Sequence, residues 1–126
     1  MHALVIDDAR SMRMLMRVTL QKLGFRVSEA ANGREGLERL STDERPDVVM
    51  VDWYMPEMDG AEFVRAVRSR PDLAGLRLVV VTGETDAAQV GKVAATGADT
   101  YVSKPFTPET IRERLGAIGL GVAYVV

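Results

Sequence analysis

The residues of this chain that could do chemistry stand at the ends of short apolar runs. They are three carboxylates, one hydroxyl and one ammonium: Asp7, Asp8, Asp52, Thr82 and Lys104. Carboxylate oxygens bind hard divalent metals, and O–H and N–H donors contact phosphoryl oxygens. If the apolar runs are parallel strands of one sheet, all five groups meet at one edge, where the carboxyl ends of the strands lie together.

A cluster of three carboxylates needs a positive partner. Two like charges ~4 Å apart repel by about 4 kcal/mol at an effective dielectric near 20. Oxygen donors suit Mg²⁺ or Mn²⁺, while Lys104 adds a positive charge and Thr82 adds a hydroxyl donor. One carboxylate then remains as a nucleophile, as in aspartyl-phosphate chemistry. Asp52 is the best candidate, because it ends the run predicted to be the central strand.

Alternating strands and helices must position these groups. The β-branched runs predict strands at about 3–7, 26–30, 47–52, 77–82 and 99–103. The run at 26–30 is more polar and is typical of an edge strand, whereas 48–51 and 78–81 are apolar on both faces, as strands covered on both sides must be.

Helical patterns lie between the strands. We expect the first helix to bury a face of apolar and small residues: Met12, Leu15, Met16, Thr19, Leu20 and Leu23. The other methionines, Met14 among them, are expected to fill the core and pack loops. Capping signals at Asn32, Asp59 and Thr107 open further helices, and one more is expected at about 85–96.

Five strand–helix units in strict alternation predict an α/β fold. The expected architecture is a flavodoxin-like (βα)5 doubly wound sandwich, with a parallel five-stranded sheet in the order 2-1-3-4-5. In that arrangement the strand order reverses between the first and third strands, while all strands stay parallel. Ligands bind at this point, which is where Asp7, Asp8 and Asp52 are predicted.

Composition excludes several classes of function. The chain has 126 residues, a net charge of −2 and no strongly basic segment, which argues against nucleic-acid binding. Cysteine is absent and His2 is the only histidine, so thiolate and histidine metal sites cannot form. No apolar stretch reaches the ~20 residues of a membrane helix. Asp7 and Asp8 precede any signal-peptide apolar region. We expect a soluble cytoplasmic protein with no membrane partner.

The C-terminal segment is the least regular part of the chain. It carries no charge from Leu115 onward, and Gly116, Gly119 and Gly121 weaken any helix there. We expect one domain at 1–118, followed at 119–126 by an apolar tail or the start of a linker. The alternative is an edge strand or an apolar patch used in self-association, in a chain that is a monomer or a weak dimer.

Two stretches around these groups carry a family resemblance. They are Asp52-Trp53-Tyr54-Met55-Pro56-Glu57-Met58-Asp59-Gly60 and Tyr101-Val102-Ser103-Lys104-Pro105-Phe106. Together with Asp7-Asp8 and Thr82, they resemble the receiver domains of two-component response regulators, over residues 3 to 118. The likeness is greatest to single-domain regulators of the chemotaxis type.

The resemblance implies a role for each matching position. Asp52 would accept a phosphoryl group from a histidine kinase or phosphotransfer protein. Asp7, Asp8, Asp52 and the Tyr54 carbonyl would bind Mg²⁺. Thr82 and Lys104 would contact the phosphoryl group, and Thr82 and Tyr101 would act as the switch. The chain would catalyse only its own phosphorylation and dephosphorylation.

The resemblance also implies regions that tune and transmit the signal. Tyr54 and Glu84 occupy positions that tune dephosphorylation, and Trp53 is expected at the surface beside Asp52. The Lys104–Pro105 peptide is expected to be cis. The output surface would be formed by the helix at about 85–96, the strand at 99–103 and the helix after Thr107.

Two other functions stay open at the level of sequence. One is a degenerate receiver that acts only as a binding module, which the intact set of acids disfavours. The other is a Mg²⁺-dependent phosphohydrolase with an Asp nucleophile. Such enzymes use a second acid two residues after the nucleophile, where this chain has Tyr54 or Ala9.

Overall fold

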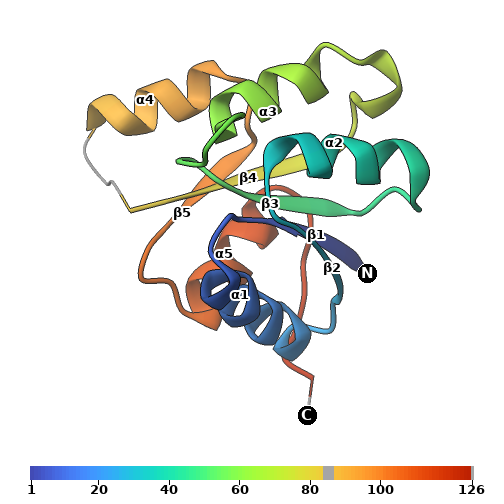
Figure 1. Ribbon diagram of the computed structural model, residues 1–126. Coiled ribbons are helices and arrows are strands. Elements are labelled where there is room, and N and C mark those ends of the chain that lie inside the picture. The colour runs from blue at the N-terminus through green and yellow to red at the C-terminus, as the bar shows by residue number, and fades with distance from the viewer. Residues whose placement is uncertain (84–86, 126) are drawn as a thin grey trace.

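A five-stranded parallel sheet forms the centre of the molecule, with helices on both faces (Figure 1). The computed structural model describes residues 1–83 and 87–125. The strands are β1 (His2–Ile6), β2 (Arg26–Ala30), β3 (Val48–Asp52), β4 (Arg77–Thr82) and β5 (Thr100–Ser103). The helices are α1 (Arg10–Lys22), α2 (Gly33–Thr42), α3 (Gly60–Arg68), α4 (Ala87–Ala95) and α5 (Pro108–Ala117), with a short 3-10 turn, η1 (Pro71–Leu73).

The strand order is β2-β1-β3-β4-β5, which confirms the predicted topology. Every neighbouring pair is parallel. Helices α2, α3 and α4 cover one face of the sheet, and α1 and α5 cover the other (Figure 1). The polar strand β2 lies at an edge, as predicted, and β1 and β3 are buried along their whole length.

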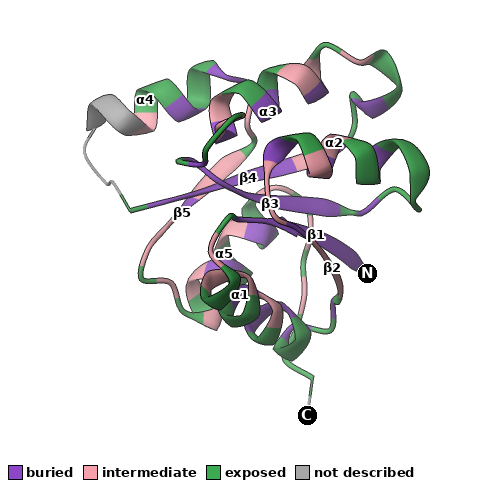
Figure 2. Cartoon of the chain, in the orientation of Figure 1, coloured by how far each residue is buried: buried purple, intermediate pink, exposed green. Residues whose placement is uncertain are grey.

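Alternation along the strands divides the core in two. Leu4, Ile6, Val49 and Val51 face the layer of α2, α3 and α4, where Phe63 is fully buried. The intervening residues of β1 and β3 face α1 and α5. Figure 2 shows the buried strands between two layers of helices whose outer faces are exposed. Both faces of the central strands are therefore apolar because each face has its own core.

The exposed face of α1 corrects the sequence prediction. Met16 and Leu20 are buried, but Leu15 is 50% exposed and Met14 is 57% exposed. Consecutive helical residues are ~100° apart, so only the stripe around Met16 and Leu20 reaches the sheet. Leu15 and Met14 are surface residues instead.

Helices α2 and α3 were both predicted to begin with a side-chain cap, at Asn32 and Asp59, but their capping hydrogen bonds differ. At α3, Asp59 accepts from the Glu62 N–H and Glu62 accepts from the Asp59 N–H, a complete capping box. At α2, Asn32 accepts from the Glu35 N–H, but the Glu35 carboxylate accepts from the Ala31 N–H instead. The cap is therefore present at both helices, and the reciprocal bond of the box forms only at α3.

The segment after α5 lies against the α1 side of the molecule. Leu120 and Val122 pack on the core that α1 and α5 cover. The Val125 N–H donates to the Lys22 carbonyl at 2.8 Å, at the end of α1. Residues 119–125 thus run from the end of α5 along the core that α1 and α5 cover, and they reach the C-terminal end of α1 (Figure 1).

None of the helices in residues 1–83 and 87–125 has the length and apolar character needed to cross a bilayer.

Candidate functional site

The register of the sheet brings the predicted site residues to one edge. Ile6 of β1 pairs with Val51 of β3, so the next residues, Asp7 and Asp52, lie side by side. On the other flank, Thr82 of β4 pairs with Ser103 of β5, and Lys104 follows. All these groups come from the carboxyl ends of parallel strands, so one edge of the sheet collects them.

The three carboxylates form a compact cluster. Asp7, Asp8 and Asp52 each offer an oxygen, and these oxygens lie within 4.8 Å of one another. Asp7 and Asp52 are buried and Asp8 is exposed. Lys104 Nζ lies 3.0 Å from Asp52 Oδ1 and 3.7 Å from Asp7 Oδ2. One ammonium therefore pairs with two of the three acids, and the cluster keeps oxygen donors and negative charge that a divalent cation could bind.

Burial changes the acidity of the two enclosed carboxyls. Desolvation raises the pKa of Asp52, the Lys104 ammonium opposes that rise, and the charges of Asp7 and Asp8 add to it. Desolvation also raises the pKa of Asp7, against the Ala9 N–H and Lys104, which lower it. Keeping these carboxylates ionised without a metal therefore costs free energy, and a bound divalent cation would lower that cost.

Three hydrogen bonds that involve the backbone hold the strand ends in place. The Ala9 N–H donates to Asp7 Oδ1 at 2.9 Å, and Arg13 Nη1 donates to the Asp7 carbonyl at 2.7 Å. On the other side, the Lys104 N–H donates to the Thr82 carbonyl at 2.8 Å. The Lys104–Pro105 peptide is cis, as predicted. Thr82 is buried, with 1% of its surface exposed, next to this loop.

Gly60 is a residue of the site that the sequence analysis did not identify. A Cβ atom at this position would lie 2.5 Å from the Asp52 carbonyl oxygen and 2.9 Å from Trp53 Cα. The Gly60 N–H also donates to the Trp53 carbonyl at 3.0 Å. The start of α3 therefore approaches the backbone of Asp52 more closely than a side chain would permit. The sequence signal is a glycine directly after the Asp59 cap.

Trp53 corrects a second expectation, because it is buried rather than exposed. Its N–H donates to the Val81 carbonyl at 2.9 Å, so sheet pairing continues past the end of β3. Trp53 therefore keeps the alternation of Val49 and Val51 and joins the core under α2, α3 and α4. Its exposed fraction is 8%, directly beside Asp52.

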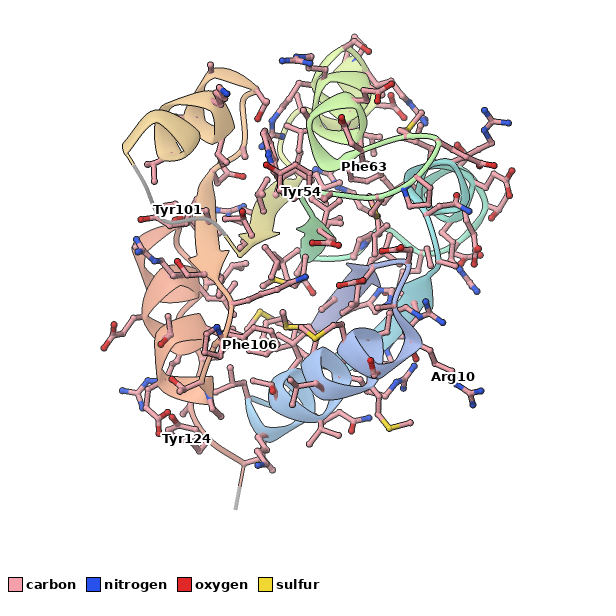
Figure 3. The ribbon with its side chains drawn as sticks, turned by 60° about the vertical axis from the view of Figure 1, so that its left-hand side comes forward. Arg10, Tyr54, Phe63, Tyr101, Phe106 and Tyr124 are labelled. Carbon is pink, nitrogen blue, oxygen red and sulfur yellow. The ribbon has the colours of Figure 1, made fainter. Side chains whose placement is uncertain are left out.

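The remaining predicted residues lie around the rim of the cluster. Tyr54 is 57% exposed on the loop after β3. Tyr101 is half-buried on β5, with Arg114 Cζ 4.7 Å from its ring centroid, a cation–π contact from α5. Figure 3, in which the carboxyl ends of the strands are turned forward, shows Tyr54 near the middle of this edge and Tyr101 at its side. Glu84 lies outside the described residues.

Comparison with known families agrees with this geometry. A model of the response regulator receiver domain matches residues 3–116. The chain belongs to this family. In this receiver domain, the strand ends of β1, β3, β4 and β5 carry the acids Asp7, Asp8 and Asp52 together with Thr82 and Lys104.

Individual relatives are chemotaxis proteins. The receiver is 36% identical over 119 residues to chemotaxis protein CheY1 of Helicobacter pylori, covering 94% of this chain and 96% of that one. It is 38% identical to the chemotaxis protein CheY homolog of Campylobacter jejuni, covering 91% and 89%. Among solved structures, the Vibrio cholerae chemotaxis response regulator CheY4 superposes with a TM-score of 0.85 at 37% identity, covering 93% and 97%.

Proposed function

We propose that this receiver takes a phosphoryl group from a phosphohistidine onto Asp52 in a Mg²⁺-dependent reaction. The donor would be a histidine kinase or a phosphotransfer protein. The observation that carries the proposal is the position of Asp52, a buried carboxylate with Lys104 Nζ 3.0 Å away and two further acids within reach of the same cation. Buried carboxylates gathered in this way are costly to fold, which is typical of a site that is kept for its chemistry.

The acid cluster fits a hard divalent cation. Asp7, Asp8 and Asp52, with the Tyr54 carbonyl, would hold Mg²⁺ or Mn²⁺. A bound cation would supply positive charge opposite both the acids and the incoming phosphoryl oxygens. The oxygen-only donor set and the shortage of positive charge around it both favour this assignment over a transition metal that prefers nitrogen or sulfur.

Transfer requires one bond to form and one to break. An Asp52 carboxylate oxygen attacks phosphorus as the phosphorus–nitrogen bond to the donor histidine breaks, and the imidazole nitrogen keeps the electron pair and takes up a proton. Lys104, now paired with Asp52 Oδ1, would contact a phosphoryl oxygen of the product. The Thr82 hydroxyl would donate to another. Asp52 is thus both metal ligand and acceptor.

The signal would be a shift between two conformations. Thr82 and Tyr101 would form the switch: Thr82 moves toward the phosphoryl group and Tyr101 rotates inward behind it. Tyr101 and its neighbour Arg114 connect β5 with α5. The surface of α4, β5 and α5 would then bind an output protein or domain in the cytoplasm.

Labelling with a small acyl phosphate tests the assignment. Acetyl phosphate with Mg²⁺ should label the chain stoichiometrically, and EDTA or Asp52→Asn should abolish labelling. Asp47→Asn, which alters an acid at the start of β3, is the matched control and should be labelled normally. Labelling that persists in Asp52→Asn would contradict the proposal. No labelling at all would leave a binding module, and continuous turnover of acetyl phosphate without a stable adduct would favour the phosphohydrolase.

A further inference from the structure

A second concave region lies at the edge of the sheet beside β2. It is a hollow of about 380 Å³ between α1, the end of β2 and the first turns of α2. Four arginines line it: Arg10, Arg13, Arg17 and Arg39. None of the carboxylates of the acid cluster is among its lining residues. It therefore adjoins the acid cluster through Arg13, which donates to the Asp7 carbonyl, but it has its own lining and the opposite charge.

The hollow is locally basic on an acidic protein. Its four guanidinium groups face two lining acids, Glu29 and Glu35, so it carries a net charge of +2 on a chain whose net charge is −2. Each guanidinium presents five N–H donors in a planar fork. Three of the arginines follow one face of α1 at positions 10, 13 and 17, and Arg39 comes from α2. The donors therefore converge from two elements.

Two of these arginines are held in place. Glu29 of β2 accepts from Arg13 Nε at 3.3 Å and from Arg17 Nε at 2.8 Å. Arg13 also donates from Nη1 to the Asp7 carbonyl at 2.7 Å. Each guanidinium keeps further N–H groups beyond those that these bonds use. The two side chains are thus fixed in orientation and still have donors for a ligand, which reduces the entropy lost on binding.

The side chains of the other two arginines, Arg10 and Arg39, can bind a ligand without breaking a strong internal interaction. Arg10 is exposed and, within residues 1–83 and 87–125, its side chain makes no hydrogen bond or ion pair. Figure 3 shows it projecting outward from the start of α1. Arg39 pairs with Asp43 one helical turn away at 3.2 Å, with both side chains more than 40% exposed. Such surface pairs contribute little, so an incoming anion can replace the partner.

We propose that this hollow binds a diphosphate group, as free pyrophosphate or as part of a nucleoside diphosphate. A diphosphate offers several anionic oxygens on two adjacent phosphorus centres, which suits guanidinium forks that approach from α1 and α2. The volume falls in the ~300–1,000 Å³ range of small-molecule sites. Met14, 57% exposed at the rim, offers an apolar contact for a base.

Calorimetric titration of the intact chain with pyrophosphate and with ADP tests the proposal. The buffer contains EDTA and no divalent metal, so that no anion is recruited by a cation at the acid cluster. We expect saturable binding of one equivalent, weakened about tenfold or more by Arg10→Gln with Arg39→Gln, because each loses a fork of charged donors. Tighter binding of ADP than of pyrophosphate would identify the nucleoside as part of the ligand.

Arg34→Gln with Arg65→Gln is the matched control, since this double variant removes the same two charges from exposed positions on α2 and α3 that do not line the hollow. It should change the affinity by no more than about twofold. Equal weakening by Arg34→Gln with Arg65→Gln, or no saturable binding to the unaltered chain at millimolar pyrophosphate and ADP, would overturn the proposal. So would tighter, Arg10-dependent binding of an acidic peptide than of either diphosphate. None of these outcomes bears on Asp52 labelling.

Discussion

At the scale of single residues, burial of Asp52 opposes the ionised state of its carboxyl group. It is buried, its pKa is raised by that burial, and Asp7 adds a like charge beside it. Lys104 compensates only in part, because it is shared between Asp52 and Asp7. The ionised form of this enclosed carboxyl is therefore costly in free energy, beside two other acids that could hold a metal ion with it.

Removing the Asp52 charge should stabilise the protein. Asp52→Asn keeps the side-chain shape and should raise the free energy of unfolding at pH 7 by about 1–2 kcal/mol without metal. A carboxyl whose pKa is raised in the folded state costs stability when it is ionised. The gain should therefore shrink as pH falls through the raised pKa of Asp52 toward its ordinary value of 3.8.

Urea denaturation between pH 4 and pH 8, with EDTA present, measures this difference. Asp47→Asn serves as the control at an acid outside the cluster. An Asp52→Asn variant less stable than the parent at pH 7 would mean that attraction to Lys104 exceeds the cost of burial.

Tyr54 should set the lifetime of the phosphorylated state. Its bulky ring stands two residues after Asp52, and we expect it to shield the phosphoryl group from attacking water. Tyr54→Ala should then shorten the phospho-Asp lifetime several-fold, while Tyr54→Phe should preserve it. Loss of label after removal of acetyl phosphate gives both rates, and an unchanged rate in Tyr54→Ala would count against shielding.

At the scale of elements, the approach of α3 to the end of β3 fixes the site. Asp59 caps α3, and Gly60 brings its first turn onto the backbone of Asp52 and Trp53. On the opposite flank, the loop after β5 places Lys104 by a bond from its N–H to the Thr82 carbonyl. Asp52 and Lys104 thus each depend on a backbone contact between two elements.

Gly60→Ala should be strongly destabilising. Its Cβ would lie 2.5 Å from the Asp52 carbonyl oxygen, and backbone cannot yield as a flexible side chain does. We expect a loss of about 2–4 kcal/mol and slower acetyl phosphate labelling. Gly116→Ala is the matched control, because it lies in α5 with no atom within 4 Å of its Cβ position and should stabilise by about 0.5–1 kcal/mol. Similar effects from both changes, in thermal unfolding, would refute the role of close approach.

At the scale of the whole molecule, the C-terminal segment completes the layer formed by α1 and α5. Leu120 and Val122 pack on the second core, and Arg77 Nε donates to the Ile118 carbonyl at 2.9 Å. Tyr124 stacks with Arg112 of α5 at 5.5 Å, beside α5 in Figure 3. These contacts join the end of the chain to β4, α1 and α5.

Truncating this segment's core contacts should therefore lower global stability. Leu120→Ala should cost about 1 kcal/mol, from apolar area returned to water. Val125→Ala, at a side chain 63% exposed, should change stability by no more than about 0.5 kcal/mol. Chemical denaturation compares them, and an unaffected Leu120→Ala variant would indicate that residues 119–125 leave the core in solution.

Much of this molecule could be predicted from local pattern. Apolar runs of period two and helical runs of period 3.6 indicate the strands and helices, and their strict alternation indicates a parallel sheet in the order that the structure confirms. Because parallel strands share a carboxyl edge, that topology already brings Asp7, Asp52, Thr82 and Lys104 together. The pattern of the sequence is therefore enough to predict the fold and the five chemical groups gathered at this edge of the sheet, but not the close approach at Gly60.

Tertiary structure alone decided which surfaces touch. The burial of Trp53 depends on pairing that continues past β3, and the exposure of Leu15 depends on the angle at which α1 meets the sheet. Likewise, a side chain is excluded at Gly60 because the start of α3 packs against the backbone of Asp52. The four arginines of the hollow come together only because α1 and α2 lie on either side of the end of β2. These are contacts between elements, and their geometry is set by packing across the whole chain rather than by the periodicity of any one segment.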